Sequence, residues 1–368
     1  MRLALRSTSA ALSLALVLST LASSAAEPPA AAEPPAPAAP AAAAAPAAAA
    51  AAAPGAPPAA VEAPAVAAPA VAAAPPSVSP PAVVEEKPAE PAPIPLNRLY
   101  LASLTLVRYN PLGLETQNRL VFQHRLLDSE SLLLRDTFVS GAASVKLNPA
   151  YIKVGPTVEL QPLAVLNLRA GYEFLGYFGS LGFLQSYPDA ARDYSDDARK
   201  IAEGASYSTT GHHVFFEPTL QARVKALAVR SKLAVEYWSM GLSGGDRVFY
   251  DATLDTLVPN KGWIVTNDTD LVFSAGRLTF GARFSGVWPI YGKDYFGAAG
   301  PPARFGGNSH MRLGPIVAFS FNTREYSSFN KPTLLAIAGW YLDHPNREGA
   351  LPYLLLGFSF TSDFLAAR

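Results

Sequence analysis

The sequence has no cysteine among its 368 residues, which excludes disulfide bonds, cysteine-based zinc sites, thiol catalysis and a lipid-modified N-terminal cysteine. It has no net charge, because 29 basic residues balance 29 acidic ones, so the overall charge does not favour a nucleic-acid partner. Beyond the first residues it also lacks apolar runs of about 18–20 residues, the length of a membrane-spanning helix. What is present is a chain of three regions with different compositions.

Residues 1–26 have the features of a secretory signal peptide. Arg2 and Arg6 precede an apolar core from Ala10 to Ala22, and Ser24-Ala25-Ala26 supplies the small residues that a signal peptidase needs. The alternative, a membrane-anchoring helix, is disfavoured because the apolar run is too short. We therefore expect an exported chain.

Residues 27–96 form a low-complexity stretch of alanine and proline that holds 20 of the 34 prolines. Proline removes backbone donors and blocks helix interiors, so we expect a disordered, partly polyproline-II linker. Its simplest role is a passive periplasmic tether. Contact with peptidoglycan or with a periplasmic partner is the alternative, and no motif supports it.

Residues 97–368 alternate apolar and polar side chains with a period of two. The clearest example runs from His213 to Trp238, where one parity is apolar and the other carries Glu217, Arg223 and Arg230. Such alternation places one parity on each face of a strand. Each run is long enough to cross a bilayer, which takes about 9–11 tilted residues.

Twelve such runs follow one another, joined by alternating tight turns and long loops. This pattern predicts an all-β fold, a transmembrane antiparallel up-and-down β-barrel of about 12 strands, with 10–14 compatible because the first three are weakly patterned. The predicted strands are 99–109, 115–126, 132–139, 151–161, 165–178, 214–224, 227–238, 263–273, 277–290, 309–322, 333–342 and 351–364. An even number of strands places both termini on one side of the membrane.

The connections between the predicted strands differ in length. The stretch from Gly141 to Asn148 is interpreted as a small, polar connection, and the longest loop runs from Gly179 to His212, with one helical turn near Asp197–Glu203. In the second long loop, Gly241–Gly262, residues 247–256 are expected to extend the flanking strands as a ribbon beyond the membrane. Gly300 and Gly306 mark a third, Gly/Pro-rich loop.

Aromatic residues gather near the predicted strand ends, as in the interfacial girdles of membrane barrels; they include Tyr177, Phe178, Tyr237, Trp238, Trp263, Trp288, Tyr291, Trp340 and Tyr341. The last strand carries Leu354, Leu356, Phe358, Phe360 and Phe364 on one parity, although four residues follow Phe364. With these features the domain resembles Gram-negative outer-membrane β-barrel proteins of the porin or channel type. The resemblance implies surrounding outer-membrane lipid, insertion by the barrel-assembly machinery through the C-terminal strand, and periplasmic termini; it identifies no subfamily.

If the apolar parity faces lipid, the other parity lines the lumen. The candidate lumen-lining residues are Arg119, Arg125, Lys153, Glu159, Arg169, Glu173, Glu217, Arg223, Lys225, Arg230, Lys232, Glu236, Asp268, Asp270, Arg277, Arg283 and Arg312. They comprise eleven cations and six anions, which favours anions in a narrow lumen. This resembles twelve-stranded monomeric channels for acidic sugars. The predicted function is a passive channel for small solutes with a weak preference for anions.

Two other functions stay open. The inward charges could pair across strands and plug the barrel, which would leave a structural anchor or a protein that binds through its long loops. An outer-membrane lipid hydrolase would need a serine and a histidine at the outer rim, where His212 and His213 lie near Ser206 and Ser208. None of the five histidines has a serine two positions later, as the outer-membrane phospholipase pattern requires.

Loop 179–212 contains carboxylates, but their spacing matches no EF-hand loop. The sequence therefore predicts no catalytic, cofactor-binding or metal-binding residue, and no enzymatic activity.

Overall fold

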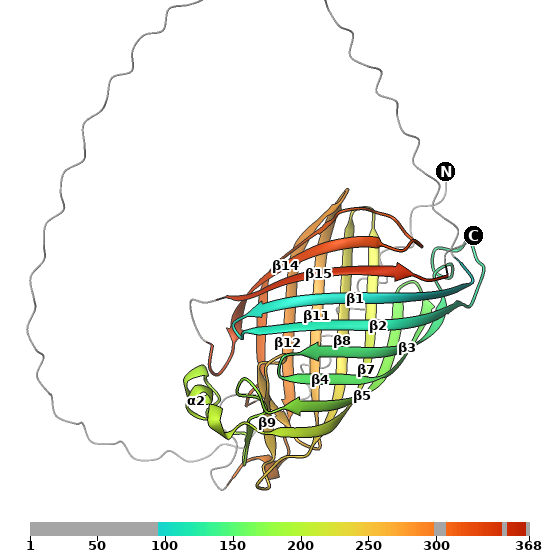
Figure 1. The fold of residues 1–368 in the computed structure, drawn as a ribbon. Helices are drawn as coiled ribbons and strands as arrows, with labels where there is room; N and C mark the ends of the chain where they lie inside the picture. Colours follow the sequence, from blue (N-terminus) through green and yellow to red (C-terminus); the bar gives the residue numbers. More distant parts are fainter. Residues whose placement is uncertain (1–94, 298–306, 348–351, 366–368) are drawn as a thin grey trace, which may run out of the picture. The chain divides into compact units, whose positions relative to one another are not determined.

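The computed structural model describes residues 95–297, 307–347 and 352–365, and its twelve long strands close into one antiparallel barrel (Figure 1). The strands are β1 (Asn97–Tyr109), β2 (Gly113–Arg125), β3 (Phe138–Asn148), β4 (Tyr151–Leu163), β5 (Leu166–Phe178), β7 (Ser208–Val224), β8 (Leu227–Met240), β11 (Gly262–Ala275), β12 (Leu278–Ile290), β13 (His310–Ser320), β14 (Asn330–Asp343) and β15 (Tyr353–Asp363). The predicted signal peptide, nearly all of the predicted linker, and the glycines at 300 and 306 lie outside the described residues.

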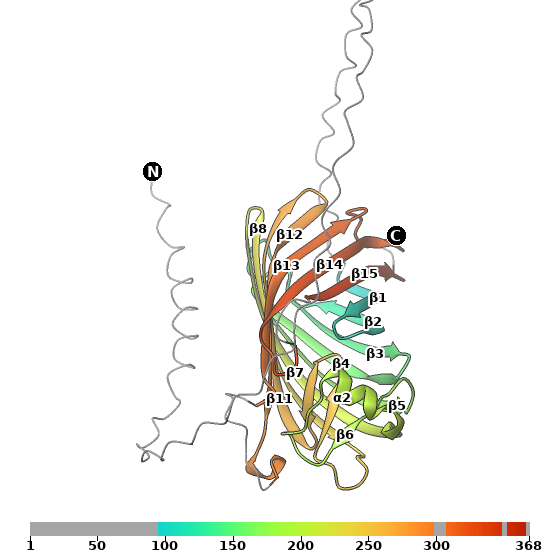
Figure 2. The same ribbon diagram turned by 90° about the vertical axis from the view of Figure 1, so that its left-hand side faces the viewer.

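Each strand pairs with its neighbours in the chain, and β1 pairs with β15 to close the ring, as the view in Figure 2 helps to follow. The closing pair runs in register from Tyr100 opposite Asp363 to Tyr109 opposite Leu354. The predicted fold class and strand number are confirmed. No helix among the described residues is long and apolar enough to cross a membrane.

The third strand was predicted in the wrong place. The segment from Gly141 to Asn148 belongs to β3, and a two-residue turn, Pro149-Ala150, joins it to β4. The preceding residues 126–137 form the connection instead. Within β3, the run of small residues from Gly141 to Ser144 lacks the large apolar side chains by which strands are recognised in a sequence. Every second residue of this run still faces inward.

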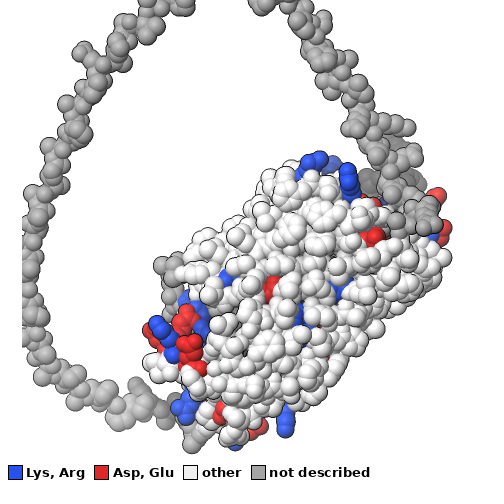
Figure 3. Space-filling model, in the orientation of Figure 1, with Lys and Arg blue, Asp and Glu red and all other residues white. Residues whose placement is uncertain are grey.

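The outer face of the barrel is apolar and large side chains are exposed along it, among them Leu120, Phe122, Val158, Leu220 and Phe273. In the face shown in Figure 3, mostly uncharged surface lies between two ends where charged side chains gather. An apolar band with charged margins is the surface that a lipid bilayer covers. The described barrel is therefore built to span a membrane.

Only part of the predicted aromatic girdle lies on this outer face. Phe178, Trp263 and Trp340 are about half exposed at the strand ends that carry the long loops. Tyr177 and Trp238, in contrast, are buried inside the barrel. Their prediction as girdle residues was wrong because side chains one position apart on a strand point to opposite faces.

The long-loop end carries further elements. Strands β6 (Ser186–Tyr187), β9 (Val248–Asp251) and β10 (Thr256–Pro259) form a small sheet in the order β10-β9-β6. Helix α2 (Asp196–Ile201) and the 3₁₀ turn η1 (Glu203–Ala205) confirm the predicted helical turn, and η2 spans Lys293–Tyr295. All eight residues of β9 and β10 are buried, so the prediction that residues 247–256 form a ribbon beyond the membrane was wrong.

A glycine permits the close approach of two strands in the barrel wall. A Cβ atom at Gly155 would lie 1.9 Å from the carbonyl oxygen of Tyr172 on β5, whereas one at Gly141 on β3 would meet nothing within 4 Å. We expect Gly155→Ala to lower the free energy of unfolding by about 1–3 kcal/mol, because the backbone must shift to admit the methyl group. Urea unfolding in detergent micelles, followed by tryptophan fluorescence, measures this change.

Gly141→Ala is the matched control for Gly155→Ala and should leave the unfolding midpoint nearly unchanged. Equal effects of the two substitutions would contradict the packing seen between β4 and β5.

Candidate functional site

A cavity of about 250 Å³ lies within the barrel, with side chains from nearly every strand around it. Besides His213, its charged lining residues are six lysine and arginine cations (Arg108, Lys146, Lys153, Lys232, Arg283 and Arg312) and five anions (Glu115, Glu217, Glu236, Asp251 and Asp268). A second cavity, of about 490 Å³, includes Arg119, Arg169 and Thr333, and Gln117 lines both. The two cavities are therefore neighbours along the lumen.

The inward cations of β2 to β8 are mostly paired across strands. Arg119 lies 2.9 Å from Glu159, Arg169 forms an ion pair with Glu217, and Lys146 lies 2.7 Å from Glu173. Further pairs join Lys232 to Glu217 and Asp268, at 3.6 and 3.8 Å, and Arg283 to Asp270, at 2.6 Å. These charges cancel in pairs, as the plugged-barrel alternative supposes.

Arg312 differs from these cations. Its guanidinium group lies 4.0 Å above the ring of Tyr353, and no ion pair joins it to a carboxylate in the part of the chain that the structure describes. It lines the cavity, so its charge acts on whatever enters there.

His213 joins two strands in the charged wall. Its ring nitrogens each lie 3.0 Å from a carboxylate, Nδ1 from Glu173 on β5 and Nε2 from Glu236 on β8, and the ring stacks on Trp238 at 4.0 Å. Both carboxylates can accept a hydrogen bond from the ring only if each ring nitrogen carries a proton. This geometry therefore fits the imidazolium form. His213 thus takes part in the lumen network and does not lie at the outer rim.

The other predicted lumen residues lie toward the short-turn end. Arg125 is 3.2 Å from Asp128, and Arg223 and Arg230 are exposed near the ends of β7 and β8. Lys225 and Arg277 lie in turns, outside the strands, and are exposed. Sequence reasoning missed three lumen residues. Arg108 and Glu115 lie within the predicted strands 99–109 and 115–126 but were not assigned to the lumen, although the alternation there carried the signal. Lys146 was missed because its segment was interpreted as a connection.

The wall opposite the charged strands is apolar. Ile316, Ile337, Tyr353 and Leu355, from β13 to β15, form a buried cluster with Leu106 of β1. In the ring of strands these stand across from β4, β5 and β7, which hold the ion pairs. The lumen therefore has an apolar cluster on β13 to β15 across from the strands that hold most of the ion pairs.

The β9–β10 hairpin, residues 248–259, fills the lumen at the long-loop end. Phe249 and Val258 pack with Leu175, Trp238 and Ile264 of the barrel wall. On its other face, Val248, Tyr250 and Leu257 are covered by Tyr194, Tyr291 and other side chains of the long loops. The hairpin is thus buried on both faces.

Polar contacts tie the tip of this hairpin to inward-facing side chains of the barrel. Asp251 accepts a hydrogen bond of 3.3 Å from the hydroxyl of Tyr177 and lies 3.7 Å from the ammonium group of Lys153. Its carboxylate also accepts hydrogen bonds from the backbone N–H groups of Thr253 and Leu254, which fixes the turn. Removal of either charge would leave the other buried without its partner.

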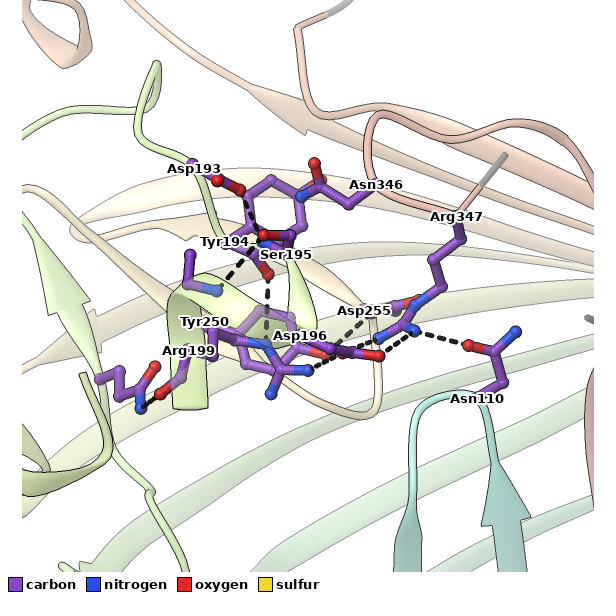
Figure 4. Close-up of polar contacts among 12 residues, drawn as sticks. Asn110, Asp193, Tyr194, Ser195, Asp196, Arg199, Tyr250, Asp255, Asn346 and Arg347 are labelled. Atoms are coloured by element: carbon purple, nitrogen blue, oxygen red, sulfur yellow. Dashed lines mark hydrogen bonds and ion pairs between the residues drawn. The ribbon is translucent and has the colours of Figure 1, made fainter. Parts of the chain in front are cut away.

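Asp255 is a second buried carboxylate of the hairpin with several partners, some of which are drawn in Figure 4. Its carboxylate accepts hydrogen bonds from Tyr250, at 2.8 Å, Tyr341, at 2.9 Å, and Arg347, at 2.5 Å. Burial alone would raise its pKa, but His344 and Arg347 outweigh this effect and hold the pKa well below 3.8. A carboxylate with a lowered pKa stabilises the docked hairpin fully above its unfolded-state pKa. This contribution decreases as the pH falls from there toward the lowered pKa of the folded state.

Arg347, in the β14–β15 loop, links the hairpin to two other segments (Figure 4). Besides Asp255, it donates hydrogen bonds to Asn110 in the β1–β2 turn, at 2.5 Å, and to Asp196 of α2, at 2.9 and 3.0 Å. Partial burial would raise the pKa of Asp196, but Arg347 and Arg199 lower it below 3.8. We call Arg347, Asp255, Asp196 and Asn110 the latch.

The described residues give no support to the hydrolase alternative. His212 lies on the outer face, where its Nδ1 is 2.7 Å from the hydroxyl of Tyr172, and none of the histidine rings in the described ranges hydrogen-bonds to a serine. In loop 179–207 the carboxylate of Asp193 caps the backbone of Ser195, and Asp189 pairs with Arg192. Within the described ranges no three His, Asp or Glu side chains are grouped to hold a metal ion.

No protein-family model matches this sequence, and no curated protein matches it. Similar solved structures include the KdgM porin, at 8% identity and a TM-score of 0.32, with 72% of this chain and 99% of the porin covered. The NanC porin is 9% identical with a TM-score of 0.34, and the match covers 72% of this chain and 100% of the porin. The translocator domain of the autotransporter NalP from Neisseria meningitidis is 10% identical with a TM-score of 0.32, and the match covers 73% of this chain and 87% of that domain. At such TM-scores these similarities carry no argument about function.

The latch predicts how firmly the hairpin is held. Because the chain has no cysteine, Leu257→Cys creates a single thiol at a fully buried hairpin position. We expect Arg347→Gln to speed maleimide labelling of this thiol by about tenfold or more, since the substitution removes the guanidinium partner of the buried Asp255 carboxylate. The labelling rate, measured by mass spectrometry, reports the undocking.

Arg192→Gln serves as the control, because Arg192 belongs to the neighbouring loop and makes only an exposed ion pair with Asp189. Equal labelling rates with and without Arg347 would show that the latch does not hold the hairpin.

Proposed function

We propose that this protein is an outer-membrane channel for small solutes, with periplasmic termini, whose resting state is closed at the long-loop end by the β9–β10 hairpin. The observation that carries the proposal is the charged cavity in the middle of the barrel. It has a second cavity beside it, and its lining includes Asp251, Thr253 and Leu254 at the hairpin tip. A purely structural anchor gains nothing from a hollow lumen, because filling it with apolar side chains would stabilise the barrel.

The contacts of the hairpin support the proposal that it can move out of the lumen and open the channel. It belongs to one connection, between β8 and β11, and its base is tied by a hydrogen bond from the backbone N–H of Asn260 to the carbonyl of Arg247. Its contacts with β1, β4, β5 and β14 are made by side chains, so it can leave the lumen without breaking a strand pair of the barrel.

The second candidate is the plugged barrel that acts as an anchor or as a surface-binding protein. The observation in its favour is the extent of the packing, since the hairpin is buried on both faces and Asp255 makes several buried hydrogen bonds. Both functions need the same barrel wall, so a measurement of transport through the barrel is what distinguishes them.

Replacement of residues 248–259 by a short Gly-Ser turn tests the closure. The variant keeps Arg247 and Asn260, whose backbone hydrogen bond already brings the two chain ends together. In planar bilayers we expect small or infrequent conductance steps from the intact protein and larger, steady steps from the variant, since the hairpin occupies the lumen.

Arg347→Gln, with the whole hairpin present, is expected to raise the frequency of openings without increasing the size of each step. If the folded hairpin variant gives no conductance, the channel proposal fails and the plugged barrel is favoured. Large steady steps from the intact protein would show that the hairpin does not close the lumen.

The selectivity of the channel follows from the charges around the cavity. Six lysine and arginine cations, together with His213, face five anions there, and most of these charges are paired, so we expect only a weak preference for anions. Arg312→Ala should lower the ratio of chloride to potassium permeability by about twofold, because this cation has no carboxylate partner among the described residues. Reversal potentials in a salt gradient, measured on the hairpin variant, give the ratio.

Arg277→Ala is the control for Arg312→Ala, since Arg277 lies exposed in a turn at the short-turn end. A preference for cations would contradict the selectivity proposed here.

A further inference from the structure

A third cavity, of about 620 Å³, lies at the long-loop end beside the β1–β2 and β3–β4 turns. None of its lining residues belongs to the lumen cavity, so it is a separate site. Its volume falls in the range of about 300–1,000 Å³ that is usual for small-molecule pockets. We call it the rim pocket.

The mouth of the rim pocket lies on the lipid-facing surface. Val107, Tyr109 and Leu114 line it and are about half exposed, and they stand on the outward parity of β1 and β2. Arg108, between Val107 and Tyr109, and Glu115, next to Leu114, face the lumen and are buried. The apolar outer wall of the barrel therefore continues into the pocket without a polar border on this side.

The inner part of the rim pocket is formed by Phe183, Ala252 and the rings of Tyr151 and Tyr177. The hydroxyl of Tyr151 is engaged with Glu115 and Thr253, and that of Tyr177 with Asp251. Because the polar ends of both tyrosines are bonded elsewhere, these side chains present mainly ring carbon to the pocket.

The two charged residues of the rim pocket neutralise each other. Arg199 forms an ion pair with Asp196 and lies 4.0 Å above the ring of Tyr250. Asp196 is also bound by Arg347. No unpaired charge is therefore available among these groups to recognise a charged ligand.

We propose that the rim pocket binds the hydrocarbon chain of a membrane lipid. An acyl chain matches apolar walls that lack an unpaired charge, and a lipid is the molecule that lies at a mouth formed by lipid-facing side chains. Burial of a methylene group gains roughly 0.8 kcal/mol, so a few methylenes suffice for measurable occupancy. Binding at this site does not depend on conduction through the lumen, and its inner end touches the hairpin at Ala252.

Photocrosslinking in lipid nanodiscs tests this binding. The full chain is reconstituted with a phosphatidylcholine that carries a diazirine near the end of one acyl chain, and the crosslinked peptides are located by mass spectrometry. We expect adducts on Phe183 and Ala252, which are not part of the outer wall, in addition to the adducts that any lipid-facing residue forms. Adducts confined to the outer wall would overturn the proposal.

Leu181→Trp fills the mouth of the pocket and is expected to reduce the adducts on Phe183 and Ala252 by about fivefold or more. Leu132→Trp is the matched control, since Leu132 and Leu181 are 71% and 67% exposed and only Leu181 lines the pocket. Unequal folding of the two variants is detected by the unfolding assay described for Gly155.

A free diazirine-bearing alkane, added to nanodiscs of unlabelled lipid, separates the two possible sources of hydrocarbon. Labelling of Phe183 and Ala252 by the alkane but not by the lipid would overturn the assignment to lipid and identify a site for diffusible apolar molecules. Conductance of the hairpin variant is recorded separately, so a failed lipid test leaves the channel proposal standing.

Discussion

Hydrogen bonding between β1 and β15 is the constraint on which the rest of the structure depends. A backbone group inside a bilayer has no water to bond to, so an unpaired strand edge is not tolerated there. Ten residue pairs between these strands remove both edges, and the ion pair of Arg98 with Asp363 adds a contact between the same strands. Closure of the barrel creates the lumen. The paired charges, the docked hairpin and the inner apolar cluster all lie in this lumen and depend on it.

The outer wall could be predicted from sequence because one physical rule governs it. Side chains that face lipid must be apolar, and on strands such as β7 and β8 this requirement leaves a period of two, from which strand number and fold class follow. The rule is weak where side chains are small, and the run from Gly141 to Ser144 is the reason why the sequence predicts a connection over 141–148 where the structure has the strand β3. It also says nothing about how a loop folds once it has left the wall.

The hairpin and the inner apolar wall were missed for related reasons. Strands buried on both faces have uninterrupted apolar runs, and Val248-Phe249-Tyr250 and Leu257-Val258 show this pattern, which distinguishes them from the alternating wall strands. Likewise Leu106, Ile337 and Leu355 stand on the inward parity of strands whose outward parity is also apolar. The pairing of charges such as Arg169 with Glu217 depends on the strand register, which a single sequence does not contain.

The latch brings together segments that are far apart in the chain. Asn110 precedes Arg347 by 237 residues, and Asp196 and Asp255 lie between them. Arg347 follows β14, whereas Asn110 lies between β1 and β2, so the latch depends on the closure of the ring that brings these two connections to the same end of the lumen. Separation of β1 from β15 would therefore also part Arg347 from Asn110 and weaken the hold on the hairpin.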